Sequence, residues 1–188
     1  MEAFLQEILP RGVGKLSFKI HPHQGKQDLL ANLPSRLRGY RSWLPSNWRI
    51  VVILDCDDDD CLKLKRRLEQ MAREADLTTK SSFKTLSYEL VNRLAIEELE
   101  AWYFGDWDAV HAAYPRVRIS RKERNRNTDS IRGTWETFER VLQKAGYFKG
   151  GLRKIEAART IARYMAPDKN TSNSFQTLCK IFREMTSS

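Results

Sequence analysis

The stretch Ile50-Val51-Val52-Ile53-Leu54-Asp55-Cys56-Asp57-Asp58-Asp59-Asp60 decides the expected fold of this chain. Its first five residues form an uninterrupted run of β-branched and aliphatic side chains. Such a run is typical of a strand that is buried on both faces of a parallel sheet. The last six positions hold five acids. The abrupt change at Asp55 predicts that the strand ends there, with the acids at its carboxyl end.

Helical and extended patterns alternate on both sides of this strand. Apolar spacing predicts a helix at residues 1–9 that Pro10 ends, and a second at 26–40 in which Pro34 starts a new segment or causes a kink. Further strands are expected at 16–20 and 90–96. The expected class is therefore α/β, with a mostly parallel central sheet flanked by helices. Ligands of such sheets bind at the carboxyl ends of the strands.

The second half of the sequence is expected to be helical. Helices are predicted at 97–104, 106–114, 135–145, 152–165 and 175–185, and a basic loop at 116–130. We expect an α/β core over residues 1–115. Residues 116–188 are expected to form the basic loop and a helical C-terminal extension packed on the same domain.

The charge of the chain favours a polyanionic partner. Lys and Arg number 33 against 24 acids, which gives a net charge of +9. The basic residues that we expect to bind nucleic acid lie in one loop and on one later helix: Arg116, Arg118, Arg121, Lys122, Arg124, Arg126, Arg153 and Lys154. They would neutralise backbone phosphates with little sequence preference. Solubility alone explains the net charge about as well.

Cysteine usage and hydropathy bear on location. The three cysteines, Cys56, Cys61 and Cys179, form neither a paired framework nor a zinc spacing. They fit a reducing compartment and buried or inert thiols. No apolar run approaches the length of a membrane span, and the N-terminus lacks the pattern of a secretory signal. A cytoplasmic protein without a membrane partner is expected.

The acids at residues 55–60 are the strongest candidates for a metal site. Residues two apart on an extended chain face the same side, so Asp55 and Asp57 are expected to share one hard cation. Mg²⁺, or Mn²⁺ in its place, needs only one or two protein carboxylates besides water and substrate phosphate. The alternative is an acidic turn that caps the following helix. A cap accounts for one or two of these acids rather than five.

A second acidic group is Glu97, Glu98 and Glu100. Helical spacing places Glu97 and Glu100 on one face and turns Glu98 away. We expect Glu97 and Glu100 to complete the metal site, with Glu100 the stronger choice. Acids near a helix N-terminus are an equally good explanation.

Histidines and tryptophans carry less information. His21 and His23 either reach the site as phosphate or proton-transfer groups or form a surface pair at a strand end, which is the favoured interpretation. Base stacking is conceivable for Trp102, Trp107 and Trp135. Packing in the core is the favoured interpretation for all three.

Four blocks of the sequence resemble a known family. They are Phe18–Asp28, Trp48–Asp60, Asn92–Asp106 and Gly150–Ala158. In this order they resemble a bacterial Toprim-like family of unknown function, related to the Toprim domains of overcoming-lysogenization-defect nucleases. The resemblance implies a Toprim-like fold in which the Asp-x-Asp at 55–57 binds metal. It also implies an ATPase partner in a bacterial defence or repair system.

The same resemblance implies a departure from the Toprim pattern. Toprim domains begin with a strand that ends in a Glu-Gly pair, whose glutamate acts as a metal-linked acid or base. Met1-Glu2-Ala3-Phe4 matches the helix that follows that strand. The expectation is therefore that this first strand and its glutamate are lacking here.

Three functions are compatible with these observations. The leading hypothesis is a Mg-dependent nuclease or nickase on nucleic acid, DNA rather than RNA, with Asp55, Asp57 and Glu100 catalytic and Asp55, Asp57, Glu97 and Glu100 as metal ligands. A non-catalytic subunit of an ATPase is the second. The third is a phosphatase of the haloacid dehalogenase type, although Asp58-Asp59-Asp60-Cys61 stands where such enzymes carry a threonine. A homodimer is compatible with all three.

Overall fold

The computed structural model describes residues 1–12, 17–82, 87–96 and 98–186, with residues 10–12 described in their backbone only. The chain divides into two compact units. The sheet unit is His21–Leu94, and the helical unit is Met1–Ile20 together with Ala95–Ser188. The expected division between residues 115 and 116 is a different one and stays a prediction.

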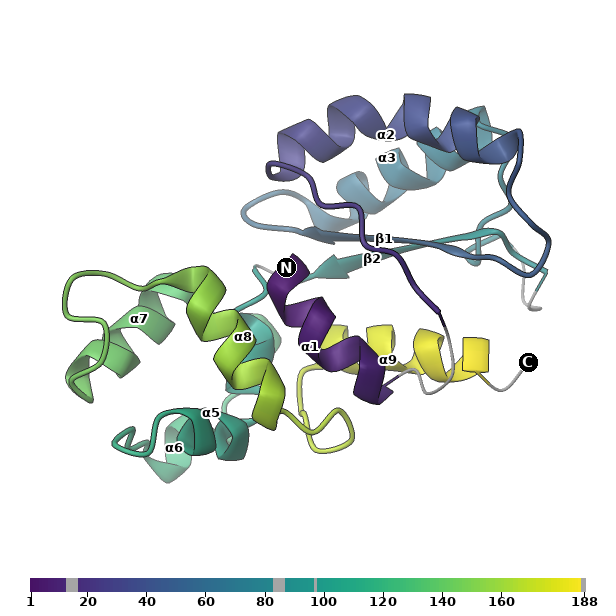
Figure 1. Ribbon diagram of the computed structural model, residues 1–188. Helices are drawn as coiled ribbons and strands as arrows, with labels where there is room; N and C mark the ends of the chain where they lie inside the picture. Colours follow the sequence, from purple (N-terminus) through teal and green to yellow (C-terminus); the bar gives the residue numbers. More distant parts are fainter. Residues whose placement is uncertain (13–16, 83–86, 97, 187–188) are drawn as a thin grey trace. The chain divides into compact units, whose positions relative to one another are not determined.

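The sheet unit holds two helices and a two-stranded parallel sheet (Figure 1). Its elements are α2 (Lys26–Arg41), β1 (Ile50–Asp55), α3 (Cys61–Glu74) and β2 (Leu90–Ala95). The α/β class is therefore confirmed, as are the strands expected at 50–54 and 90–96.

The apolar run of β1 explains the core of the sheet unit. Val52 and Leu54 are buried, whereas Val51 and Ile53 on the opposite face are half-buried. Helices α2 and α3 pack together beside the sheet (Figure 1). The buried side chains that form this core are Leu30, Leu33, Leu37, Val52, Leu54, Leu64, Leu68, Met71, Ala72, Ala75, Leu77 and Leu90.

Two local expectations about secondary structure were wrong, and one of two alternatives for a third was wrong. Residues 17–23 form no strand, and Leu16 lies outside the described residues. Helix α2 continues through Pro34, so no new segment starts there, because Leu33 and Leu37 stay buried on its inner face and their packing outweighs the missing backbone hydrogen bond. The other alternative, a kink at Pro34, stays a prediction. Helix α1 likewise continues past Pro10 to Gly12.

The helical unit is built from short helices. They are α1 (Glu2–Gly12), α4 (Ala101–Phe104), α5 (Trp107–Ala113), α6 (Arg121–Arg124), the 3₁₀ helix η1 (Thr128–Ser130), α7 (Thr134–Lys144), α8 (Lys154–Tyr164) and α9 (Asn173–Thr186). The basic segment expected as a loop thus contains α6 and η1. Ser120 and Glu123 form a capping box that starts α6.

Aromatic side chains fill the core of the helical unit. The Phe4 ring of α1 lies 5.6 Å from Trp102 and 6.0 Å from Phe175. Trp102 and Trp107 are buried, so the interpretation of these two as core residues is confirmed. Trp135 is half-buried, and the Lys154 ammonium lies 4.5 Å from its ring centroid.

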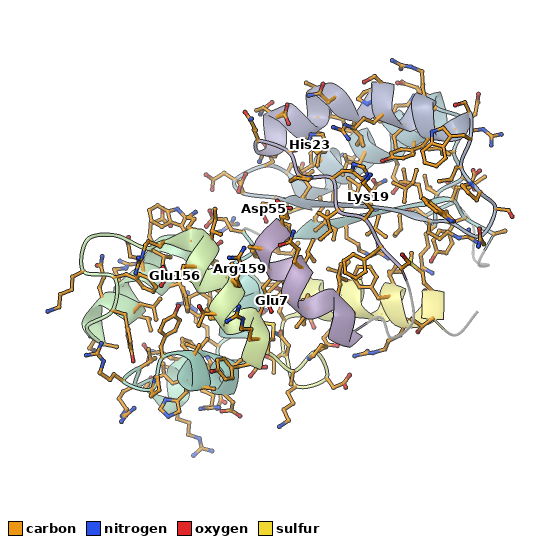
Figure 2. All side chains as sticks on the ribbon, viewed as in Figure 1. Glu7, Lys19, His23, Asp55, Glu156 and Arg159 are labelled. Atoms are coloured by element: carbon orange, nitrogen blue, oxygen red, sulfur yellow. A yellow bond between two sulfur atoms is a disulfide. The ribbon has the colours of Figure 1, made fainter. Side chains whose placement is uncertain are left out.

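Helix α8 is central to the helical unit and packs against α1 and α5. Glu7 of α1 and Glu156 and Arg159 of α8 lie on these neighbouring helices (Figure 2). Glu7 pairs with Arg163 at 3.4 Å. Among the described residues, no helix is long and apolar enough to cross a membrane.

Candidate functional site

The candidate site lies at one edge of the sheet unit. Strand β1 ends at Asp55, and both α2 and α3 begin at this edge (Figure 1). Figure 2 shows Asp55 at the end of β1 and His23 just before α2. We call residues 55–60 the acid loop. This is the carboxyl edge, where ligands of parallel sheets bind.

Lys26, the first residue of α2, is held by the acid loop. Its Nζ lies 2.6 Å from Asp57 Oδ2 and 2.7 Å from Asp59 Oδ2. It also donates a hydrogen bond of 3.2 Å to the Cys56 carbonyl oxygen. Burial lowers the pKa of Lys26, but the bonds to Asp57 and Asp59 outweigh it, so the pKa is raised above 10.5. Three oxygens of one loop therefore converge on one cation.

The pair of carboxylates that converges differs from the expected pair. Asp57 has a φ of +49°, so the chain is not extended there and the alternation that would align Asp55 with Asp57 is broken. The Asp59 amide donates 3.1 Å to the Cys56 carbonyl and closes a turn. This turn brings Asp59, rather than Asp55, to Lys26 beside Asp57. Asp55 is half-buried, and its Oδ1 is fully buried.

Asp60 has the capping role that was the alternative for this cluster. Its side chain accepts hydrogen bonds from the backbone N–H groups of Leu62 and Lys63 at the start of α3. The backbone bond from Lys63 lowers the pKa of Asp60, with a smaller contribution from Leu62. The capping interpretation is therefore confirmed for this one acid.

A disulfide joins Cys56 of the acid loop to Cys61, the first residue of α3. Cys56 and Cys61 are bonded to each other, and their Cα atoms are 5.7 Å apart. The expectation of three unpaired thiols was wrong for these two, because the turn over residues 57–59 brings both ends of the loop together. Cys179 is a buried free thiol, and burial raises its pKa to about 11.

The segment before α2 supplies two polar groups to this edge. His23 Nδ1 lies 2.9 Å from Asp28 Oδ2. The backbone N–H of Gln24 and then His23 lower the pKa of Asp28.

Lys26 was not predicted from the sequence to belong to the site. Its signal was Gly25-Lys26 directly before a helix, where Gly25 has a φ of +93° that favours glycine.

The second acidic group lies in the helical unit. Glu97 is outside the described residues. Glu98 accepts hydrogen bonds from Thr134 Oγ1 at 2.9 Å and from the Trp135 backbone N–H at 3.1 Å. Its carboxylate also lies 3.7 Å from Lys154 Nζ. Glu98 therefore stabilises the start of α7.

Glu100 is a buried acid directly before α4. Burial raises its pKa above 4.5, although Lys154 acts in the opposite direction. The structure brings Glu98, Glu100 and Lys154 together within the helical unit. Asp55 and Asp57 belong to the sheet unit, so a metal site shared by Asp55, Asp57 and Glu100 stays a prediction.

The basic residues of the 116–126 segment are all exposed. Some of them already have partners within the helical unit. Arg116 stacks 4.2 Å from the Tyr147 ring centroid, and Arg124 pairs with Asp108 at 2.9 Å. Arg118 donates to the Pro115 carbonyl at 2.7 Å. Arg121, Lys122 and Arg126 are exposed as well and form no ion pair within the described part of the chain.

The other two basic residues, on α8, interact with neighbouring side chains. Arg153 pairs with Glu156 at 3.0 Å, and its guanidinium lies 5.4 Å from the Phe148 ring centroid. Lys154 is held between Glu98 and Trp135. Both side chains remain substantially exposed, so their charge still contributes to the basic surface of this unit.

The donor set of the acid loop is compatible with a hard divalent cation. Two carboxylates and a carbonyl oxygen are ligands that Mg²⁺ accepts. The ammonium of Lys26 occupies the point where these oxygens converge, so a divalent ion must displace it. Among the described residues, no group of three or more His, Cys, Asp and Glu side chains is arranged to hold a metal. Water or substrate oxygens would therefore complete the coordination.

The fold and the site define a mixed α/β protein with a parallel sheet and an acidic carboxyl edge that holds a cation. A family model described as a domain of unknown function, DUF4276, matches residues 1–183. The chain therefore belongs to this family. No curated protein and no solved structure matches it.

Proposed function

We propose that the chain is a Mg²⁺- or Mn²⁺-dependent nuclease that acts on nucleic acid phosphodiesters at the acid loop. The observation that carries the proposal is the convergence of Asp57, Asp59 and the Cys56 carbonyl on one cation, Lys26. An edge that binds one cation through oxygens can exchange it for another of higher charge. The relation to Toprim domains, a role in bacterial defence or repair, and a cytoplasmic location are parts of the same proposal.

Each residue at the edge has a distinct part in this proposal. Asp57 and Asp59 would hold the metal, and Asp55 would orient its water ligands from the end of β1. The bound metal would polarise the scissile phosphate and lower the pKa of water. Lys26, once displaced, keeps a positive charge at the same edge, where it can pair with a phosphate oxygen.

Nucleic acid would be held by the exposed basic residues of the helical unit. Arg121, Lys122 and Arg126 are exposed on and beside α6. Such side chains neutralise backbone phosphates and give affinity without sequence preference. The net charge of +9 supports this assignment.

Metal-dependent cleavage tests the proposal directly. Supercoiled plasmid and a single-stranded DNA would be incubated with the protein in Mg²⁺, Mn²⁺ or EDTA. Asp57→Asn should reduce the rate of cleavage by at least about 10-fold. Removing a residue that only hydrogen-bonds to a metal ligand already lowers activity by about 10- to 100-fold, and Asp57 would be a ligand itself.

Asp76→Asn is the matched control for this substitution. Asp76 lies in the same unit, is exposed, and has a φ of +54°, close to the +49° of Asp57. Asn tolerates this conformation as well as Asp does, so backbone effects are equal in the two variants. Absence of metal-dependent cleavage by the wild-type protein, or equal loss in both variants, would contradict the proposal.

One observation favours a second function. Lys26 already neutralises two carboxylates of the acid loop. A chain in which this pairing is permanent fits a non-catalytic subunit that acts with an ATPase. Co-purification of an ATPase whose activity is unchanged by Asp57→Asn would select this function over the nuclease.

A further inference from the structure

An exposed group of aromatic rings lies on the sheet unit, between α2 and β1. Tyr40 is near the end of α2, and Trp43 and Trp48 follow in the connecting segment. Trp43 is 55% exposed and Trp48 is 53% exposed. We call these three residues the aromatic platform. A group of large aromatic side chains with more than half of their surface in water gains little from burial in the fold. Such a group is typical of a surface that binds another molecule.

The rings of the aromatic platform hold one another in place. The ring centroids of Tyr40 and Trp43 are 5.4 Å apart, and those of Trp43 and Trp48 are 6.1 Å apart. His21 packs edge-on against Tyr40 at 6.2 Å. Backbone hydrogen bonds from Trp43 to Tyr40 and from Trp48 to Pro45 fix the two turns that carry the indoles. Each ring of the platform thus packs against at least one other ring.

The charge around the aromatic platform suits a polyanion. Residues 29–54 contain four arginines and no acid. Arg36 and Arg38 are exposed on α2. Arg49 donates 2.7 Å bonds to the carbonyls of Ser46 and Trp48, so its cation is fixed beside the platform. Arg41 is partly offset by Glu89, at 3.3 Å.

We propose that the aromatic platform stacks the bases of single-stranded nucleic acid while Arg36, which shares a face of α2 with Tyr40 one helical turn later, contacts its phosphates. Every base presents a π-face, so stacking of this kind tolerates any sequence. Bases inside a duplex already stack on one another and are not accessible to these rings. This proposal depends on the proposed function in one respect: it takes single-stranded nucleic acid to be the substrate that the acid loop cleaves.

Binding in the absence of metal tests this site separately from cleavage. A fluorescently labelled oligo(dT) would be titrated with the full chain in EDTA, and its anisotropy recorded. Trp43→Ala and Trp48→Ala should each weaken binding about 5- to 150-fold, the range measured for loss of one stacking ring. Phe at either position keeps a π-face and should retain most of the affinity. A duplex of the same length should bind more weakly and respond less to these substitutions.

The matched control is Tyr164→Ala. Tyr164 is 54% exposed, like the two tryptophans, but it lies at the end of α8 in the helical unit. Its loss should leave oligo(dT) binding unchanged. Arg36→Gln should make the slope of log affinity against log salt less negative by about 0.7, whereas the tryptophan substitutions should not change that slope.

Three outcomes would overturn the proposal. One is wild-type affinity for oligo(dT) in both alanine variants, with circular dichroism confirming that they are folded. Another is equal loss of affinity in the alanine and phenylalanine variants. The last is quenching of tryptophan fluorescence by anionic lipid vesicles but not by oligo(dT), which would assign the platform to a membrane surface. Stacking without any metal-dependent cleavage would support this site and contradict only the nuclease.

Discussion

Replacing Lys26 by Met removes the cation of the acid loop while keeping an aliphatic chain of similar length. The ammonium is bonded to Asp57 at 2.6 Å and to Asp59 at 2.7 Å, and its side chain is only 15% exposed. The two carboxylates are 43% and 54% exposed, so water screens both pairs. Partly exposed ion pairs contribute about 0.2–1 kcal/mol each, so the loss of both should be roughly 0.4–2 kcal/mol.

This loss should appear in the melting temperature without metal. About 1 kcal/mol corresponds to 2–4 °C for a chain of this size, so Tm should fall by roughly 1–8 °C. The pKa of Lys26 is raised above 10.5. Its contribution is therefore complete at pH 7 and is lost only as the pH rises through that higher value. Measurements at pH 7 to 8 compare the full effect.

Magnesium should reverse the destabilisation and bind the variant more tightly. In the wild-type chain Mg²⁺ competes with the ammonium for the same oxygens. Removing a competitor worth roughly 0.4–2 kcal/mol should lower the Mg²⁺ dissociation constant about 2- to 30-fold. Calorimetric titration of both proteins with MgCl₂, and Tm as a function of Mg²⁺, measure the two effects.

Lys63→Met is the control for the change of charge. Lys63 also lies beside the acid loop, but it is 77% exposed and 3.8 Å from Asp60. It should change neither Tm nor Mg²⁺ affinity appreciably. If the Lys26 variant binds Mg²⁺ no more tightly than the wild type does, Asp57 and Asp59 do not form a divalent site and the proposed function loses its main support.

Three further predictions concern buried and cross-linked groups. The pKa of Glu69 is lowered to about 2, because hydrogen bonds from Asn92, Thr79 and Lys65 outweigh burial. The stabilisation of the fold by this carboxylate should be complete above pH 4.5 and lost as the pH falls towards 2. In urea unfolding, Glu69→Gln should lower the free energy of unfolding by roughly 2–3 kcal/mol at pH 7 and change it little at pH 2. Burial raises the pKa of Glu100 above 4.5, so this acid destabilises the fold progressively as the pH rises above 4.5, and fully once the pH exceeds the raised pKa. Glu100→Gln should therefore raise Tm at high pH and leave it unchanged below pH 4.5. An unchanged Tm at both would refute the burial argument. Because Cys56 and Cys61 are bonded, the unfolded, unreduced chain should contain one titratable thiol. Reduction of the disulfide should lower the free energy of unfolding by about 2 kcal/mol. Detection of three free thiols by mass spectrometry would exclude the bond.

The elements of the fold that could be predicted are those that a local pattern determines. The apolar run at 50–54 and the helical spacing at 26–40 require no knowledge of distant residues, and both elements are present. The strand expected at 16–20 rested on three alternating apolar residues. Alternation favours a strand only where a neighbouring strand supplies hydrogen bonds, and residues 17–20 have no such partner in the described part of the chain.

The candidate site was predictable in composition but not in detail. The sequence predicted a group of acids at the end of β1, and it predicted the alternative that such an acid caps the next helix. Asp60 does cap α3. The partner of Asp57 could not be predicted, because Lys26 is 31 positions away and reaches it only once α2 packs against α3. The fixed indoles of the aromatic platform likewise depend on turns whose geometry the sequence does not specify.

The left-handed conformation of Asp57 explains why the expected pairing of Asp55 with Asp57 was wrong. Asp enters this region more readily than most residues do, so a run of aspartates is at once a run of ligands and a run of turn formers. In the acid loop the turn takes precedence, and it changes which carboxylates meet. Asp76 adopts the same conformation after α3 without a described cation partner in the sheet unit. Positive φ alone therefore does not mark a ligand. What distinguishes Asp57 is the cation that α2 places beside it, and this is the contact that the Lys26→Met experiment removes.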